Sequence, residues 1–266
     1  MAILIKKDMN APIVYFGGKN GMAKHIIDFF PDKETYDTYI EPFGGSYGVG
    51  LHMDYIPPIE IYNDLDKNLY SLYKVLQDKD LFAEFQRLCE LSPISEDLYY
   101  EYKDSLRNDD LSILDRAYKF FYISRTSYNG NGGFRVNCSV RRKTSKSVSD
   151  YLSVVERLEE LHNRVTNLIV CHKDGIGLIN KWKDKENVLI YCDPPYVQST
   201  RRSNYRYNID MEDDIHEKFL EVCLDCKCKM LISGYDNSKY DILLNNGYNK
   251  VNFVVNHRIE TLWKNY

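Results

Sequence analysis

The sequence lacks the features that would place it among secreted, membrane or Walker-type phosphate-binding proteins. Its seven cysteines show no even disulfide framework, its first residues contain no apolar signal-peptide core, and no apolar run is long enough to span a bilayer. Strict Gly-x-Gly-x-x-Gly and Gly-Lys-Ser/Thr patterns are missing, which argues against a Walker loop and gives a dinucleotide site little support. We therefore expect a soluble protein of a reducing cytosol with no membrane partner.

Convincing metal-ligand patterns are also missing. Cys223, Cys226 and Cys228 are close enough in the sequence to suggest a metal site, but the first two fit a helix that ends just before the next strand. No second ligand pair stands nearby. Buried or half-buried thiols explain the cluster better, so we expect no metal.

Acidic residues are absent from one long stretch of an otherwise acidic chain. The formal net charge is −4 over 266 residues and the pI is about 5.9, which gives no sign of nucleic-acid binding by the chain as a whole. Between Asp115 and Asp150, however, there is no Asp or Glu, while basic residues accumulate. These are Arg116, Lys119, Arg125, Arg135, Arg141, Arg142, Lys143 and Lys146. Such a run is often only a solvated face, but the interleaved aromatic residues favour a nucleic-acid surface.

The centre of this stretch predicts a recognition element. Residues 128–137 combine Asn-Gly turn chemistry with flanking strand formers, which predicts a hairpin or a glycine-jointed loop. Tyr128, Asn129 and Arg135 are of types that read or wedge bases, whereas basic charge follows phosphates. A second basic loop, residues 197–208, contains Arg201 and Arg202 and is interpreted as a substrate-ordered flap or as a merely flexible connection.

The most informative stretch is the corner Asp193-Pro194-Pro195-Tyr196. It follows the apolar run 188–191, which is typical of a buried parallel strand. The prolines fix φ and leave their carbonyls free to accept, so a carboxylate and a carbonyl can both accept hydrogen bonds from an exocyclic amine while the tyrosine ring stacks on its heterocycle. The other interpretation is an ordinary turn after a strand.

A nucleotide-fold pattern occupies the first 66 residues. The predicted strand 38–40 runs into the glycine-rich segment 41–50, and the predicted strand 60–62 ends in Asn63-Asp64-Leu65-Asp66. A glycine-rich turn lets a ligand approach the backbone, and an acid at the end of the next strand can bind two ribose hydroxyls. With no pyrophosphate site, a nucleoside such as S-adenosylmethionine fits best. A bend required only for close packing is the alternative.

The remaining pattern completes an α/β sheet interrupted by an insertion. Residues 68–115 have helical periodicity, and a helix is predicted over 213–225, followed by a strand over 229–233. Residues 248–255 alternate like an antiparallel edge strand. The order strand, helix, strand thus resumes after the corner.

Taken together, these residues resemble the Dam-type DNA adenine N6-methyltransferases, the alpha group of the D12 class, often found in phages and restriction-modification systems. The resemblance rests on Tyr15-Phe16-Gly17-Gly18-Lys19, Glu41-Pro42-Phe43-Gly44-Gly45, Asn63-Asp64, Arg125-Thr126-Ser127-Tyr128-Asn129-Gly130, the corner at 193–196, Ile232-Ser233 with Asp236, and Glu260-Thr261-Leu262-Trp263, in family order over essentially the whole chain. Two departures are a shortened hairpin after Gly130, which leaves the recognised sequence open, and the bulky Tyr47 in the cofactor element.

The resemblance implies a Rossmann-like S-adenosylmethionine-dependent catalytic domain formed by residues 1–66 and 167–266, with a helical and hairpin recognition domain inserted at 67–166. Its implied cofactor residues are Tyr15, Gly17, Lys19, Glu41, Pro42, Phe43, Gly44, Gly45, Asp64 and Asp193, and the implied catalytic residues are Asp193, Pro194, Pro195 and Tyr196. Duplex DNA would contact Arg125, Tyr128, Asn129, Arg135, Arg141, Arg142, Lys143, Arg201 and Arg202. A cognate restriction endonuclease is a further implied partner, in the cytoplasm of a bacterial or phage-infected cell.

The expected reaction is methyl transfer from S-adenosylmethionine to N6 of a flipped adenine. Asp193 and the Pro194 carbonyl would draw the N6 protons out of conjugation, and Tyr196 would stack on the base. Cys192 precedes the corner, so we assign it a structural role rather than that of a nucleophile. Two other classes stay open, a methyltransferase on RNA or a protein side-chain amide, and a catalytically silent DNA-binding protein.

Overall fold

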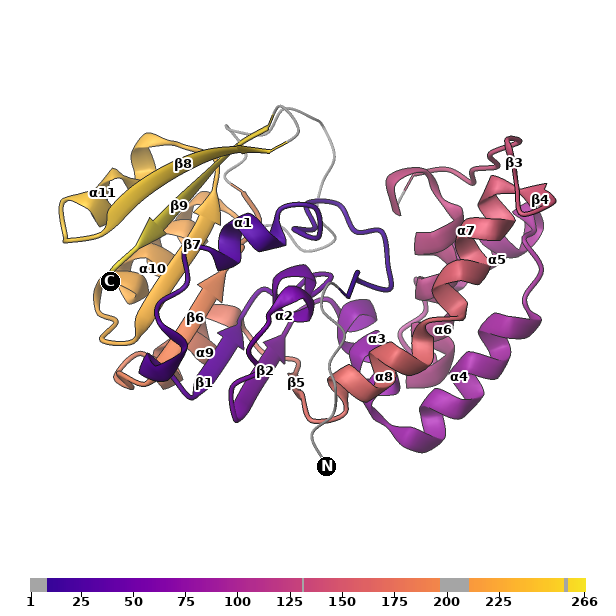
Figure 1. Cartoon of the computed structure of the whole chain (residues 1–266), viewed down its shortest axis with the longest axis horizontal. Helices are drawn as coiled ribbons and strands as arrows, with labels where there is room; N and C mark the ends of the chain where they lie inside the picture. Colours follow the sequence, from indigo (N-terminus) through magenta and orange to yellow (C-terminus); the bar gives the residue numbers. More distant parts are fainter. Residues whose placement is uncertain (1–8, 131, 197–210, 256–257) are drawn as a thin grey trace. The chain divides into compact units, whose positions relative to one another are not determined.

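The computed structural model describes residues 9–130, 132–196, 211–255 and 258–266, and its helices and strands are labelled in Figure 1. The chain forms two compact units. One contains Met1–Gly21, Gly45–His52 and Lys67–Leu168, and the other contains Met22–Gly44, Met53–Asp66 and Ile169–Tyr266. Within the described ranges no helix is long and apolar enough to cross a membrane.

The second unit is built on a seven-stranded sheet of order β5-β2-β1-β6-β7-β9-β8. Its strands are β1 (Thr38–Glu41), β2 (Ile59–Asn63), β5 (Ile169–Cys171), β6 (Val188–Cys192), β7 (Lys229–Gly234), β8 (Asn249–Val255) and β9 (Arg258–Lys264). The first five in this order pair in parallel, and β9 is antiparallel to both β7 and β8. The predicted parallel core and antiparallel edge strand are confirmed.

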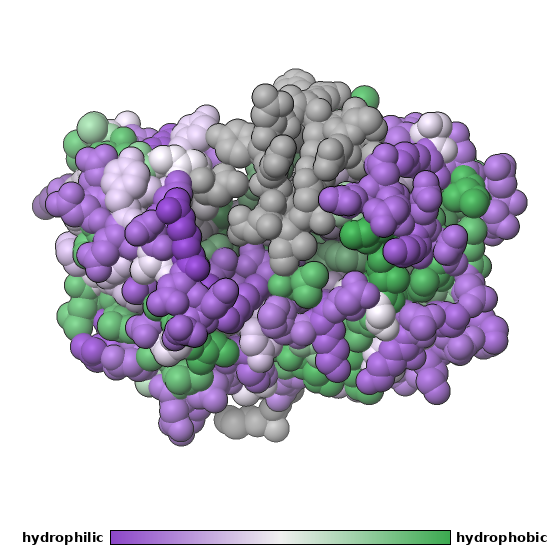
Figure 2. All heavy atoms as spheres, turned by 180° about the vertical axis from the view of Figure 1, so that it is seen from behind, coloured by the Kyte–Doolittle hydropathy of each residue, from purple (hydrophilic) through white to green (hydrophobic). Residues whose placement is uncertain are grey.

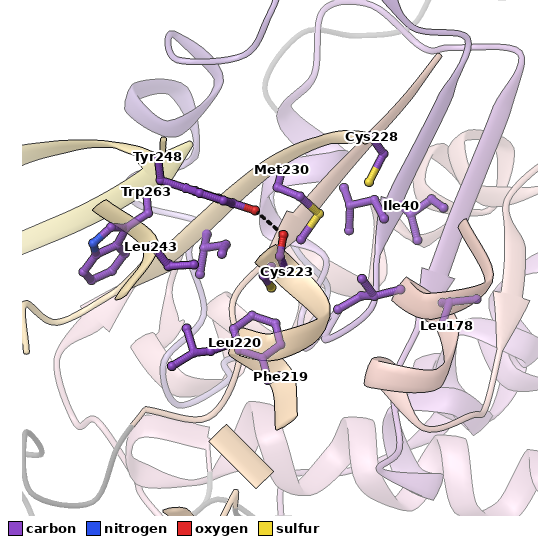
Figure 3. Packing of buried hydrophobic residues seen from close by; sticks show 14 of the residues in the cluster. Ile40, Leu178, Phe219, Leu220, Cys223, Cys228, Met230, Leu243, Tyr248 and Trp263 are labelled. Carbon is purple, nitrogen blue, oxygen red and sulfur yellow. Dashed lines mark hydrogen bonds between the residues drawn. The ribbon is translucent and has the colours of Figure 1, made fainter. Parts of the chain in front are cut away.

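Helices cover both faces of the sheet, which explains why all five residues of β6 are buried. On one face lie α9 (Gly175–Trp182), α10 (Asp213–Leu224) and α11 (Asp241–Leu244), whose apolar side chains pack with Ile40, Ile190 and Met230 (Figure 3). Tyr248 crosses this core and donates its hydroxyl to the Cys223 carbonyl at 2.8 Å. On the other face, near α1 (Ala23–Ile27), the Phe30 ring lies 5.6 Å from that of Tyr39.

The first unit is mainly helical. Its elements are α2 (Gly48–His52), α3 (Lys67–Gln77), α4 (Lys79–Leu91), α5 (Glu96–Ser105), α6 (Ile113–Thr126), α7 (Lys146–Val155), α8 (Leu158–Val165) and the short hairpin strands β3 (Val140–Arg141) and β4 (Thr144–Ser145). Asp78, Ser95, Ser112 and Ser145 accept backbone N–H bonds at the starts of α4, α5, α6 and α7. Three 3₁₀ turns, η1 (Lys33–Thr35), η2 (Tyr128–Gly130) and η4 (Ser238–Tyr240), complete the described elements of the two units.

On the face seen in Figure 2, hydrophilic side chains predominate and apolar ones lie in patches between them. Some positive charge is internal instead. Arg116 is buried on α6, where its guanidinium donates to the Asn68 side chain at 3.1 Å and to the Asn108 carbonyl at 2.6 Å. Part of the acid-free stretch therefore stabilises helix packing and is not a surface.

Candidate functional site

The candidate site lies at the carboxyl edge of the parallel strands, where the strand order reverses. From β1 the chain proceeds to β2 and β5 on one side, while β6 and β7 lie on the other, so β1 and β6 flank the switch point. Open α/β sheets bind ligands in the crevice outside this edge. β1 ends in Glu41 and β6 is followed by Asp193, so the two strongest sequence patterns are neighbours in space.

Gly44 is required by close packing at the end of β1. A Cβ on this residue would lie 2.3 Å from the Tyr62 ring, and its N–H donates to the Asn63 carbonyl at 2.8 Å. The turn after β1 is thereby drawn against the end of β2. Phe43, next to it, packs its ring against Phe219 of α10 at 5.8 Å, so it is partly a core residue.

Asn63 ties three strand ends together. It is fully buried, and its amide nitrogen donates to the carbonyls of Pro42 and Lys173 at 2.8 and 2.9 Å, while its oxygen accepts the Lys173 N–H at 2.9 Å. Asp64 follows, half-buried, with one carboxylate oxygen accepting the Asp66 N–H at 2.8 Å. The acid is thus held rigidly at the carboxyl end of β2.

The corner after β6 is held by tertiary contacts. Pro194 is buried, Asp193 is half-buried, and Tyr196 is 8% exposed. The Tyr196 hydroxyl donates to Glu260 Oε1 at 2.5 Å, and its ring meets that of Tyr235 edge-on, with centroids 4.7 Å apart.

Buried acids surround this corner. The Tyr39 hydroxyl donates to Glu41 at 2.7 Å, and both side chains are buried. Burial, followed by the charges of Asp193 and Glu260, raises the pKa of Tyr196 well above its usual value. Acidic side chains therefore gather at this edge, and the phenol stays a hydrogen-bond donor.

The surroundings of the Cys192 thiol argue against a role as nucleophile. It is fully buried on β6, where burial, and then the neighbouring Cys223 and Cys226, raise its pKa well above the usual value. A reactive thiolate requires a lowered pKa and access to solvent. Among the described residues, no group of three or more His, Cys, Asp or Glu side chains could hold a metal ion.

The remaining cofactor pattern, residues 15–19, lies in the helical unit together with Gly45. The Gly18 N–H donates to the Tyr15 carbonyl at 3.0 Å, and a Cβ on Gly45, whose φ is +50°, would lie 3.4 Å from the Tyr15 ring. Lys19 is buried, and its ammonium group donates a hydrogen bond to the Gly17 carbonyl at 3.2 Å. The glycines thus bring the 15–19 turn against the start of the 45–48 segment.

Tyr47 points into the core of the helical unit. Its ring is fully buried, T-shaped to that of Tyr73 at 5.9 Å, and a Cβ on Gly50 would lie only 2.2 Å from it. The φ of Tyr47 is +55°, a costly conformation for a non-glycine residue. Tyr47, the bulky residue at which the cofactor element differs from the family pattern, therefore fills a space left by the missing side chain of Gly50.

The predicted base-reading residues share one loop, although no regular hairpin forms there. Ser127 and Phe134 make an isolated antiparallel bridge, and between them Tyr128 and Asn129 are exposed. The Arg135 guanidinium lies 5.2 Å from the Tyr128 ring centre. Of the two alternatives predicted for residues 128–137, the described residues fit the glycine-jointed loop, and a regular hairpin forms further on at β3 and β4.

The β3–β4 hairpin carries the basic triplet. Arg142 and Lys143 form its two-residue loop with φ of +51° and +64°, as in a type I′ turn. Arg141 pairs with Asp150 at 3.0 Å, and Arg142 approaches Glu156 at 3.6 Å. Lys143 makes no hydrogen bond or ion pair to any residue that the structure describes.

Three of the predicted DNA-binding residues remain, Arg125, Arg201 and Arg202. Arg125 is half-buried at the end of α6, donates weakly to the Asp150 carbonyl at 3.5 Å, and lines a cavity of about 490 Å³ with Arg157 and the apolar residues Val154 and Leu158. Arg201 and Arg202 lie outside the described residues.

Sequence reasoning did not assign roles to Glu260 or Tyr235, or to the Asn63 side chain. Glu260 belongs to a short pattern near the end of the chain, and only its approach to Tyr196 reveals a role. Asn63 precedes the predicted ribose acid, and a polar residue inside a buried strand was the available signal.

Comparisons with known proteins identify the family of the chain. The family model for D12 class N6 adenine-specific DNA methyltransferase matches residues 15–260. Type II methyltransferase M.CviBI of Paramecium bursaria Chlorella virus NC1A is 26% identical over 249 residues, 90% of each chain. The DNA adenine methylase of Serratia marcescens is 22% identical over 240 residues, 86% of this chain and 85% of that protein. Type II methyltransferase M.FokI of Planomicrobium okeanokoites is 25% identical over 74% of this chain but only 30% of that longer protein. The chain belongs to the D12 class N6 adenine-specific DNA methyltransferase family.

Proposed function

We propose that this adenine methyltransferase transfers a methyl group from S-adenosylmethionine to N6 of an adenine flipped out of duplex DNA. The observation that carries the proposal is the pairing of β1 with β6, which places the glycine turn after Glu41 beside the Asp193 corner at the switch point. When bound, the cofactor supplies an activated methyl group on a sulfonium cation.

The residues at this edge fit such a cofactor. Glu41, Asp64 and Asp193 make it acidic, which suits a positive sulfonium, and the held carboxylate of Asp64 suits a pair of ribose hydroxyls. The family resemblance also implies a cofactor role for Tyr15 and Lys19, which lie in the helical unit.

Asp193 and the Pro194 carbonyl accept hydrogen bonds from the exocyclic amine of adenine. These hydrogen bonds would localise the lone pair on N6 and so make the amine a better nucleophile. The bound cofactor would supply the methyl group and leave as a neutral thioether, and N6 would lose one proton to solvent. Tyr196 stacks on the base. Because its ring is only 8% exposed, the residues that cover it must move when DNA binds.

Duplex DNA is held by the helical unit. Tyr128, Asn129 and Arg135 read bases from one exposed loop, and Lys143 contacts phosphate from the tip of the β3–β4 hairpin. On this proposal residues 67–166 act as the recognition domain and the sheet unit as the catalytic domain. The Type II names of two relatives support a cognate restriction endonuclease as partner. A DNA substrate supports action in the cytoplasm of a bacterial or phage-infected cell.

The test is radiolabelled methyl transfer to unmethylated duplex DNA, RNA and protein in parallel. We expect label only in DNA, as N6-methyladenine. Asp193→Ala should abolish transfer but keep the fold, whereas Asp184→Ala, at an exposed ion pair with Lys227, should be fully active. Near-normal turnover of Asp193→Ala would contradict the catalytic role of Asp193. Label in RNA or protein would show that DNA is not the substrate.

A further inference from the structure

A buried hydrogen bond links the corner to the last strand of the chain. The Tyr196 hydroxyl donates to Glu260 Oε1 at 2.5 Å, a short distance typical of an O–H to carboxylate bond. Both side chains are almost completely buried, with 8% and 3% exposure. Burying a carboxylate costs free energy unless the group accepts hydrogen bonds, so the bond from Tyr196 stabilises Glu260 in its buried position.

The antiparallel end of the sheet brings Glu260 to the site. Thr261 pairs with Gly234, the last residue of β7, so Glu260 lies just beyond the carboxyl end of that strand. In the β8–β9 ladder Glu260 stands opposite Phe253. Parallel strands alone present only their own carboxyl ends at this edge, whereas the reversed β9 adds a carboxylate from a residue 64 positions after Tyr196.

The bond fixes a side chain that its own backbone does not fix. Residues 193–196 have no regular secondary structure, so the Tyr196 ring direction depends on tertiary contacts. Among these contacts are the edge-on contact with Tyr235 and the bond to Glu260. Because burial and the nearby acids raise the pKa of Tyr196, its hydroxyl remains a donor over the whole working pH range.

We propose that Glu260 is a positioning residue for methyl transfer, which holds the Tyr196 ring in the orientation that receives the flipped adenine. It would act only through Tyr196 and would touch neither the base nor the cofactor. The inference rests on the proposed role of Tyr196 as the stacking face. It predicts a loss in the rate of the chemical step without a loss of cofactor affinity.

The experiment is a double-mutant cycle in the full chain. Glu260→Ala and Tyr196→Phe should each lower the single-turnover methylation rate roughly 10- to 100-fold, as expected for loss of a hydrogen bond to a charged group. The double variant should be no slower than the slower single variant, because both remove the same interaction. Glu260→Gln keeps an acceptor oxygen and should recover most of the rate.

Two further readouts separate positioning from a general loss of structure. S-adenosylmethionine affinity, measured by calorimetry, should be unchanged in both single variants. The fluorescence of 2-aminopurine placed at the target position should be quenched less in these variants than in the unaltered protein, because the base stacks less well on the Tyr196 ring. Ile259→Ala is the matched control, since this neighbour on β9 is exposed. It should behave like the unaltered protein in every assay.

The outcomes distinguish this inference from the proposed function. If Tyr196→Ala is inactive while Tyr196→Phe keeps the full rate, the ring matters but the bond to Glu260 does not, and the positioning role is wrong. Additive losses in the cycle would also overturn it. If Tyr196→Ala itself keeps the full rate, the stacking role fails, and with it the basis of the inference. Should Glu260→Ala not fold, Tyr196→Phe alone still decides between these results.

Discussion

Replacement of Asn63 tests how the carboxyl edge of the sheet is held together. Asn63→Ala removes three side-chain hydrogen bonds, two to the carbonyls of Pro42 and Lys173 and one from the Lys173 N–H. At roughly 0.5–1.5 kcal/mol each, their loss amounts to about 1.5–4.5 kcal/mol, and stranded backbone groups move the value toward the upper end. We expect the free energy of unfolding to fall by about 3–4 kcal/mol, a large part of the roughly 5–15 kcal/mol of a typical domain.

The assay is urea unfolding followed by circular dichroism, with two companion variants. Asn63→Asp keeps the shape but turns an oxygen toward two carbonyl oxygens, so it should be at least as destabilising as the alanine variant. Asn187→Ala removes an exposed amide bond to Asp37 of 2.8 Å and should change the free energy by no more than about 0.5 kcal/mol. A loss below about 1 kcal/mol for Asn63→Ala, or a stable Asn63→Asp, would refute the role of this amide in joining the strand ends.

Three other predictions follow from single residues. Asp64→Ala should weaken S-adenosylmethionine binding in calorimetry far more than DNA binding, and equal affinity would move the ribose contact elsewhere. Lys143→Ala should lower the slope of log affinity for DNA against log salt concentration by about 0.9, and an unaltered slope would contradict a phosphate contact. Tyr128→Ala should leave that slope unchanged but make the enzyme less selective for the sequence it methylates, and equal selectivity would contradict a base-reading role. Burial, with Tyr55 and Glu60, raises the pKa of Tyr36 to about 12, so the stability that its protonated form contributes is complete below about pH 10 and is lost as the pH rises toward 12. Unfolding free energies that do not fall between about pH 10 and 12 would contradict this.

The sequence by itself determined the strands and turns of the candidate site. β6 is recognisable because a strand buried on both faces is a continuous apolar run, and the corner follows from proline, whose φ is fixed. These features depend on neighbouring residues, and local chemistry is what a sequence displays directly. Gly44, by contrast, was predicted only from the family resemblance, and its close packing against Tyr62 belongs to the tertiary structure.

Only the tertiary structure decided which of these residues act together. Glu260 meets Tyr196 because an antiparallel strand returns to the parallel edge, and Val14 belongs to the helical unit because its backbone bonds to Ser124, 110 positions away. The same holds for the positive charges of the acid-free stretch. Arg116 is internal and Arg141 is paired with an acid, whereas composition counts them all alike. Charge and hydrogen-bond partners depend on distances through space, and these are set only when the whole chain has packed.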